Sequence, residues 1–272
     1  MPAWVAALAA QIEGSLQALW GDKDMAAQTT EKSNIRPMVI AHRGSSKAAP
    51  ENTLAAFEQA IQDGADAIEF DVHLTKDGHI VIIHDNTVDR TTDGLGSVPE
   101  STLAELKRLD AGGWFHPSFK GERIPTLPEA LALTKGRCKI NIEIKGFPLE
   151  YTGIEERILE DLREAGFPLE DVFVSSFNHF YLVRMKELAP ELPVATLFHG
   201  LPVSLRDFPG EIVHPIWYTV GDRLMKMVRE SGRKVNTYMI DDEERFRRMV
   251  HFGVDGMTTN VPALIRRLVD AL

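Results

Sequence analysis

The sequence predicts an α/β protein, a TIM-type (β/α)8 barrel that occupies residues 38–272. Short segments rich in β-branched residues alternate with amphipathic helical segments from residue 38 onward, and this alternation indicates a parallel sheet. A length of 272 residues suits one such barrel with small additions. Charged or titratable residues also follow several strands in succession, at the end of the barrel where active sites lie.

Nine segments are predicted as strands, one more than the barrel requires. They are Met38–Ala41, Ala67–Val72, His79–His84, Lys139–Ile144, Val172–Ser175, Val194–Phe198, Ile212–His214, Val235–Met239 and Gly256–Thr258. The short segment Ile212–His214 is the weakest of them, and it is the natural candidate for the surplus strand.

Helical periodicity separates most of these strands. The predicted helices include residues 53–63, Glu155–Ala165, Phe180–Leu188, Arg223–Ser231, Glu243–Phe252 and Ala263–Leu272. The segment from Asn86 to Pro125 is too long for a barrel loop. We therefore predict a small insertion after the third strand, at about residues 86–125, with one short helix near Leu103–Leu109.

Residues 1–37 are predicted to form an amphipathic helix followed by a polar linker. Apolar residues recur there at spacings of three and four. Because no Lys or Arg precedes Lys23, packing against the domain or within a homo-oligomer is favoured over attachment to a membrane surface. The same lack of early basic residues argues against a secretory signal, and no segment reaches the length of a membrane span. We expect a cytoplasmic protein, with a periplasmic location as the alternative.

The chain is acidic, with a net charge of −10 and a pI of about 5.4. This charge argues against nucleic-acid binding through a broad basic surface. Any site for a phosphate group must therefore be built locally, from a metal ion or a few converging cations.

Carboxylates lie at the ends of two neighbouring strands of the predicted barrel. Glu69 and Asp71 close the second strand, and Glu143 closes the fourth. Residues two apart on a strand face the same side, so these three carboxylates should converge. Converging buried carboxylates require a cation, and oxygen ligands favour magnesium or calcium over zinc. One divalent metal ion, Mg²⁺ or Ca²⁺, is the expected cofactor.

Two histidines and two cations flank this cluster. His42 and Arg43 follow the first strand, His84 closes the third, and Lys145 follows Glu143 by two residues. Histidine suits general acid and base roles near neutral pH, while Arg43 and Lys145 can bind phosphate oxygens. The set predicts a site for phosphoryl transfer, in preference to one for sugar or acyl chemistry. A plain ion pair between Glu143 and Lys145 remains an alternative.

These residues lie in a series of ordered motifs. The series comprises Ala41-His42-Arg43-Gly44, Pro50-Glu51-Asn52-Thr53, Ala67-Ile68-Glu69-Phe70-Asp71-Val72, Thr75-Lys76-Asp77-Gly78, His84-Asp85, Arg90-Thr91-Thr92, Ile124-Pro125-Thr126-Leu127, Ile142-Glu143-Ile144-Lys145, Ser175-Ser176-Phe177 and Gly253-Val254-Asp255-Gly256. Over about residues 38–262 the chain resembles the glycerophosphodiester phosphodiesterase family.

The resemblance implies a TIM-type barrel with a small insertion and a reaction that cleaves a small-molecule phosphodiester to sn-glycerol 3-phosphate and an alcohol. It implies that Glu69, Asp71 and Glu143 hold the metal, and that His42 and His84 are the acid–base pair. Phe177 and Tyr238 would contact the substrate, Tyr238 as an aromatic wall for the glycerol. A plausible route has the glycerol 2-hydroxyl attack phosphorus, giving a cyclic phosphate that water then opens.

Two segments depart from the pattern of that family. Where the family often has Trp-Thr-Val-Asn, this chain has Tyr238-Met239-Ile240-Asp241, and where a Thr-Asp pair commonly follows the last strand, Thr259-Asn260 stands here. The added negative charge of Asp241 predicts a changed preference for the alcohol head group.

Three other functions are consistent with parts of the pattern. A relative that acts on lysophospholipids or sphingolipids at a membrane would need an exposed apolar rim, which Trp114, Phe115 and Phe119 could provide. A non-catalytic binding protein on the same barrel should lack a histidine or a carboxylate of the set, and none is lost. A magnesium-dependent enolising barrel enzyme would not need Arg43 beside His42.

Overall fold

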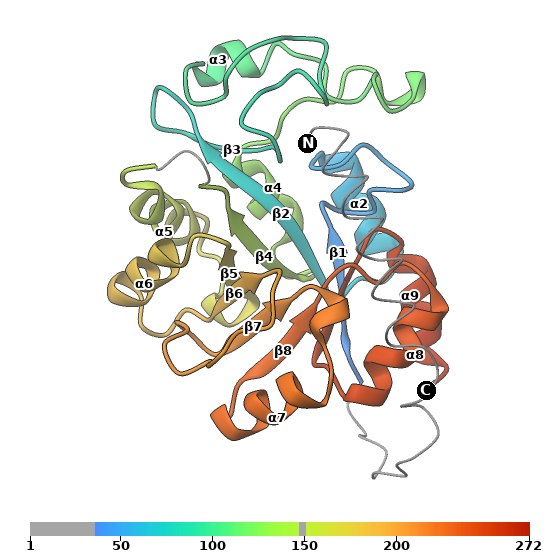
Figure 1. Ribbon diagram of the computed structural model, residues 1–272. Helices are drawn as coiled ribbons and strands as arrows, with labels where there is room; N and C mark the ends of the chain where they lie inside the picture. The colour runs from blue at the N-terminus through green and yellow to red at the C-terminus, as the bar shows by residue number, and fades with distance from the viewer. Residues whose placement is uncertain (1–35, 147–150) are drawn as a thin grey trace. The chain divides into compact units, whose positions relative to one another are not determined.

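The computed structural model describes residues 36–146 and 151–272. Eight parallel strands form a closed barrel in this part of the chain, because β1 pairs with both β2 and β9 (Figure 1). The barrel strands are β1 (Met38–His42), β2 (Ala67–Leu74), β4 (Lys139–Ile144), β5 (Val172–Ser176), β6 (Val194–Phe198), β7 (Ile212–Pro215), β8 (Lys234–Thr237) and β9 (Gly256–Thr259). The predicted fold class is confirmed.

One strand assignment was wrong. The segment predicted as the third barrel strand forms β3 (Ile80–Ile82), which pairs antiparallel with β2 and lies outside the barrel. Ile212–Pro215, the supposed surplus strand, is a barrel strand between β6 and β8. Only residues 75–79 separate β2 from β3, and a parallel crossover needs a dozen or more residues.

Helices follow most barrel strands and cover the outside of the sheet (Figure 1). They are α2 (Leu54–Gln62), α4 (Leu127–Thr134), α5 (Ile154–Ala165), α6 (His179–Leu188), α7 (Asp222–Ser231), α8 (Glu243–Phe252) and α9 (Pro262–Asp270). The sequence prediction missed α4, although Thr126 and Glu129 form a capping box at its start. The predicted N-terminal helix and linker fall almost entirely within residues 1–35, outside the described residues, so the homo-oligomer and the cytoplasmic location that we expect remain predictions.

The barrel interior changes from apolar to polar along the strands. Its floor is an apolar cluster formed by Ile40, Ala67, Phe173, Ala195 and Ile212. Side chains two residues apart on a strand face the same side, so the positions that follow Ile40, Ala67 and Phe173 on the inner face are His42, Glu69 and Ser175. The apolar floor therefore supports a polar layer at the carboxyl ends of the strands.

The insertion after β3 has a small core of its own. Val88, Val98, Leu106 and Ile124 are among its buried residues, and it contains α3 (Leu103–Leu106) and a 3-10 turn at Pro117–Phe119. It lies beyond the carboxyl end of β2 (Figure 1). Trp114 is 41% exposed there, while its indole N–H donates to the carbonyl of Ala111. In the described part of the chain no helix is long and apolar enough to span a bilayer.

Candidate active site

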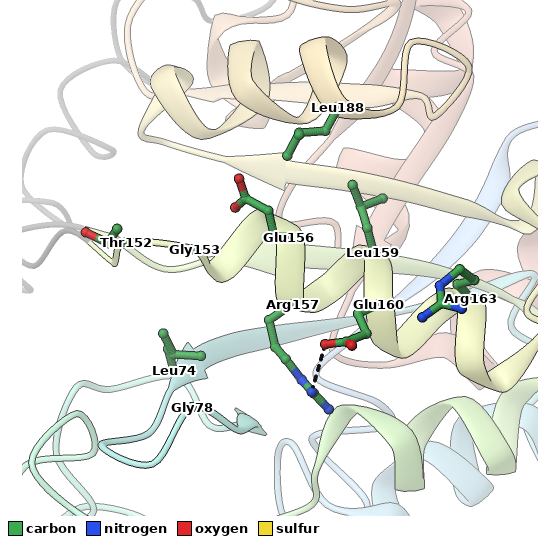
Figure 2. A pocket seen from close by; sticks show the side chains of 10 residues that line it. All are labelled: Leu74, Gly78, Thr152, Gly153, Glu156, Arg157, Leu159, Glu160, Arg163 and Leu188. Carbon is green, nitrogen blue, oxygen red and sulfur yellow. Dashed lines mark hydrogen bonds and ion pairs between the residues drawn. The ribbon is translucent and has the colours of Figure 1, made fainter.

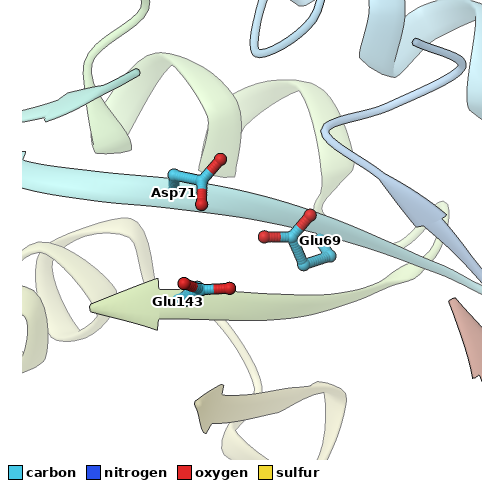
Figure 3. Close-up of side chains that lie close together, drawn as sticks. All are labelled: Glu69, Asp71 and Glu143. Atoms are coloured by element: carbon cyan, nitrogen blue, oxygen red, sulfur yellow. The ribbon is translucent and has the colours of Figure 1, made fainter. Parts of the chain in front are cut away.

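Three carboxylates converge at the mouth of the barrel. Glu69 and Asp71 project from β2 toward Glu143 on the neighbouring strand β4, as Figure 3 shows. One oxygen from each lies within 4.8 Å of the other two, and this is the only such group of potential metal ligands among the described residues. All three side chains are buried. The structure thus brings the predicted metal-binding residues together.

The chemistry of this cluster fits a hard divalent cation. Glu69 Oε1 is buried and accepts no hydrogen bond, a costly state for a carboxylate. Among the described residues, Asp71 Oδ1 likewise accepts none and has only the ammonium of Lys145 as an ionic partner. Burial and the charges of Asp71 and Glu143 raise the pKa of Glu69 well above its usual value. The three groups therefore repel one another as anions, and an ion with oxygen ligands would relieve that repulsion.

The two predicted phosphate-binding cations lie against these carboxylates. Lys145 Nζ is 2.6 Å from Glu143 Oε1 and 3.3 Å from Asp71 Oδ1, so the ion pair considered from the sequence is present. Arg43 Nε is 3.1 Å from Asp71 Oδ2. Burial alone would raise the pKa of Asp71, but Lys145 and Arg43 hold it well below its usual value. Both side chains keep a small exposed surface, 17% for Arg43 and 19% for Lys145.

The backbone after β1 is shaped to hold Arg43 in place. Arg43 adopts a left-handed conformation, with φ of 57°, and its N–H donates to Glu69 Oε2 at 2.9 Å. Asn52 is also left-handed, with φ of 59°, and its side-chain amide donates to Asp71 Oδ2 at 2.8 Å. Such conformations are costly away from glycine and gather at functional sites. Two strained turns thus orient the carboxylates of β2.

Substitution of Gly44 by alanine is expected to destabilise the protein by more than about 2 kcal/mol. Gly44 has φ of +81°, and a Cβ there would lie 2.6 Å from the backbone of Ala56 on α2. Thermal and urea unfolding of G44A would measure the loss. Gly78 provides the matched control, because it has a similar φ of +80° but open space around a Cβ. Equal destabilisation of the two variants would show that the close contact with α2 contributes nothing.

His42 is held by a residue at the opposite end of the chain. Its Nδ1 lies 2.7 Å from Asn260 Oδ1. Burial, reinforced by the nearby charge of Arg43, lowers the pKa of His42 to about 3. The imidazole is therefore neutral at physiological pH, as a proton acceptor must be.

His84 reaches the same mouth from the insertion side. Because β3 runs antiparallel to β2, the chain returns toward the carboxylates and places His84 after Ile83, whose N–H donates to the carbonyl of Asp71 at 3.0 Å. Nδ1 of His84 lies 2.6 Å from Asp85 Oδ1. The hydrogen bond from His84, with help from Arg90, depresses the pKa of Asp85. His84 is thus placed as predicted, although its strand was assigned wrongly.

Three residues, Glu51, Asp85 and Arg90, link the two sides of the mouth, and none of them was among the site residues predicted from the sequence. Arg90 pairs with Asp85 at 2.6 Å and with Glu51 at 2.7 Å, and Glu51 in turn accepts from Arg43 at 2.9 Å. Glu51 and Arg90 stand in motifs that supported the family resemblance, which was the available signal. Ion pairs and hydrogen bonds therefore connect Arg43 on the barrel to His84 at the start of the insertion.

Aromatic side chains gather after the barrel strands β5, β6 and β8. Phe177 follows β5 and is 38% exposed, and its ring stacks on His199 with centroids 4.6 Å apart. Tyr238 meets both rings edge-on, at 6.3 Å from Phe177 and 6.2 Å from His199. The structure thus joins the two residues predicted to contact the substrate. It adds His199, whose position directly after the strand Val194–Phe198 was the missed signal.

A hollow on the outside of the barrel is a feature separate from the site. It has a volume of about 700 Å³ and is bordered by α5 and by Leu74 and Gly78 near the β2–β3 turn (Figure 2). Arg157 on its wall pairs with Glu160 at 3.0 Å. None of the site residues lines it, so the chemistry belongs to the barrel mouth.

A parallel barrel with a buried carboxylate cluster, two histidines and two cations at its mouth defines a class of hydrolases that act on phosphoric esters. Residues 42–264 match the glycerophosphoryl diester phosphodiesterase family. The chain belongs to this family and is a phosphoric diester hydrolase, as the sequence motifs predicted.

Relatives and solved structures agree with this assignment. A glycerophosphodiester phosphodiesterase of Caldanaerobacter subterraneus is 44% identical over 241 residues, which cover 86% of this chain and 98% of that protein. An Oleispira antarctica phosphodiesterase, solved in complex with its product sn-glycerol-3-phosphate, is 36% identical with a TM-score of 0.79 and covers 86% of this chain and 97% of its own. The glycerophosphodiester phosphodiesterase of Agrobacterium tumefaciens is 30% identical with a TM-score of 0.75, covering 85% and 99%.

Proposed function

We propose that this protein hydrolyses glycerophosphodiesters to sn-glycerol 3-phosphate and an alcohol, with one Mg²⁺ or Ca²⁺ ion held by Glu69, Asp71 and Glu143. The observation that carries this proposal is the cluster of three buried carboxylates, two of which keep an oxygen without a hydrogen-bond partner. Oxygen ligands of this kind suit either ion. The solved relative with bound sn-glycerol-3-phosphate supports the choice of product.

The bound ion would neutralise charge on the phosphate and so favour attack at phosphorus. Arg43 and Lys145, which already lie against the carboxylates, would bind the phosphate oxygens that remain exposed. Phe177 and Tyr238 would cover the apolar faces of the glycerol and the alcohol. These contacts would orient the diester between the two histidines.

The two histidines would exchange protons in two steps. In the first step, His42 accepts the proton of the glycerol 2-hydroxyl, and the oxygen of that hydroxyl bonds to phosphorus. The bond between phosphorus and the alcohol oxygen breaks, and His84 gives a proton to the departing alcohol. In the second, water bonds to phosphorus and gives its proton to His84, while His42 returns its proton to the 2-oxygen as the cyclic bond breaks. A neutral His42 in the resting enzyme suits the first step.

The test is release of sn-glycerol 3-phosphate from glycerophosphocholine by EDTA-treated protein, before and after addition of MgCl₂ or CaCl₂. We expect no release without metal and turnover with one of the two ions. Metal-independent release would contradict the role of the carboxylates, and no release with either ion would contradict the proposed substrate. Faster cleavage of lysophosphatidylcholine liposomes than of glycerophosphocholine would favour the membrane-lipid alternative, for which Trp114 and the insertion would have to form the lipid contact.

A further inference from the structure

The two segments that depart from the family pattern meet each other beside His42. Asp241 follows β8, and Asn260 follows β9. Asp241 Oδ2 accepts a hydrogen bond from Asn260 Nδ2 at 2.6 Å, and Asp241 Oδ1 accepts from the Asn260 backbone N–H at 2.8 Å and from Thr259 Oγ1 at 3.1 Å. Both oxygens of this carboxylate are therefore engaged by the segment that contacts His42.

These contacts determine which way the Asn260 amide faces. An ionised carboxylate only accepts hydrogen bonds, so the atom of Asn260 that faces Asp241 must be the NH₂ group. The oxygen of the amide then faces His42 Nδ1 at 2.7 Å and also accepts from Ser46 Oγ at 2.9 Å. The orientation of the Asn260 amide therefore follows from the fact that Asp241 can only accept hydrogen bonds.

The contact with Asn260 also determines which nitrogen of the His42 imidazole carries the hydrogen. Because Asn260 Oδ1 is an acceptor, His42 Nδ1 must carry a hydrogen, and the lone pair of the neutral ring lies on Nε2. Hydrogen-bond partners of this kind commonly select the tautomer of a functional histidine.

We propose that Asp241 is a positioning residue which, through Asn260, holds His42 in the Nδ1–H tautomer and so leaves Nε2 free for proton transfer. The consequence for catalysis rests on the acid–base role proposed for His42 above, whereas the tautomer itself does not. This role is separate from the effect on head-group preference that the sequence suggested for Asp241, which stays a prediction.

Reciprocal substitution tests the proposal. In Asp241→Asn the new amide NH₂ can donate to Asn260 Oδ1, so the Asn260 amide can rotate and turn its own NH₂ group toward His42. We expect kcat to fall about 10- to 100-fold with little change in KM, because the effect reaches the substrate only through His42. Asn260→Asp alone should also lose activity, since it places two carboxylates in contact. The double variant D241N/N260D restores an acceptor at His42 and should recover most of the loss.

Imidazole ¹⁵N–¹H correlation spectra of the folded protein give the direct readout. The wild type should show His42 protonated at Nδ1, and D241N should show a mixture or the reverse. Asp242→Asn is the matched control, because this adjacent acid caps α8 and its change should leave kcat and the His42 spectrum unaltered.

Wild-type kcat in D241N, a change confined to KM, or a double variant no better than the singles would overturn the proposal. An Nε2–H tautomer in the wild type would also overturn it, whether or not the protein cleaves glycerophosphodiesters. The spectra therefore separate a failure of this inference from a failure of the proposed function.

Discussion

Replacement of His84 by alanine is expected to lower kcat by about 10²- to 10⁴-fold, the usual contribution of a general acid or base. The side chain is 28% exposed and hydrogen bonds to Asp85, so its removal leaves no large cavity and should change the midpoint of thermal unfolding little. Steady-state kinetics with glycerophosphocholine at saturating metal would give kcat and KM separately.

His251 supplies the matched control for this variant. It is an exposed histidine on α8, and His251→Ala should retain full turnover. His42→Ala should show a loss comparable to that of His84→Ala, because in the proposed mechanism each histidine serves both proton-transfer steps. Full turnover in H84A would remove His84 from the reaction and leave the proton to a group in the insertion or to water.

Replacement of Glu143 by glutamine is expected to lower both the affinity for the divalent ion and kcat, each by more than about 100-fold. The amide has nearly the same shape but removes one of the three charges that converge at the mouth. It also releases Lys145, which then has only Asp71 as an ionic partner within 4 Å among the described residues. Calorimetric titration of metal-free protein would measure the affinity, and kinetics at saturating metal would measure kcat.

Glu244→Gln controls for the loss of one negative charge. Glu244 is exposed in the first turn of α8, so its substitution should alter neither quantity. An unchanged metal affinity in E143Q would mean that Glu143 is not a ligand and that it serves only to hold Lys145.

The sequence predicted the barrel well because its strands carry a strong local signal. Each barrel strand is a short, almost wholly buried run, and helices with clear polar faces lie between most of them. The segment that forms β3 was wrongly assigned to the barrel because its residues are as buried as those of the barrel strands. The interval between β2 and β3 was the overlooked signal. Asp77-Gly78 within a five-residue connection is typical of an antiparallel hairpin.

The site was predictable in part for a similar reason. Position at a strand end was enough to identify Glu69, Asp71 and Glu143, because the barrel topology alone brings strand ends together. The links between Arg43, Glu51, Arg90 and Asp85 depend on how the insertion folds back over the mouth. The contact of His42 with Asn260 joins residues 218 apart. Such contacts between distant residues form only in the folded chain, so no local sequence pattern predicts them.

The antiparallel course of β3 has a consequence for how this enzyme can be recombined with its relatives. One histidine of the proposed acid–base pair ends barrel strand β1, and the other follows the β2–β3 hairpin that leads into the insertion. A chimera that exchanges residues 75–125 would therefore replace His84, one of the two proposed catalytic histidines, together with the insertion. The proposed ligands of the metal ion and of the phosphate, which lie outside this segment, would stay unchanged. In the proposed mechanism, one of the two proton-transfer groups and the insertion can therefore be exchanged as a single segment.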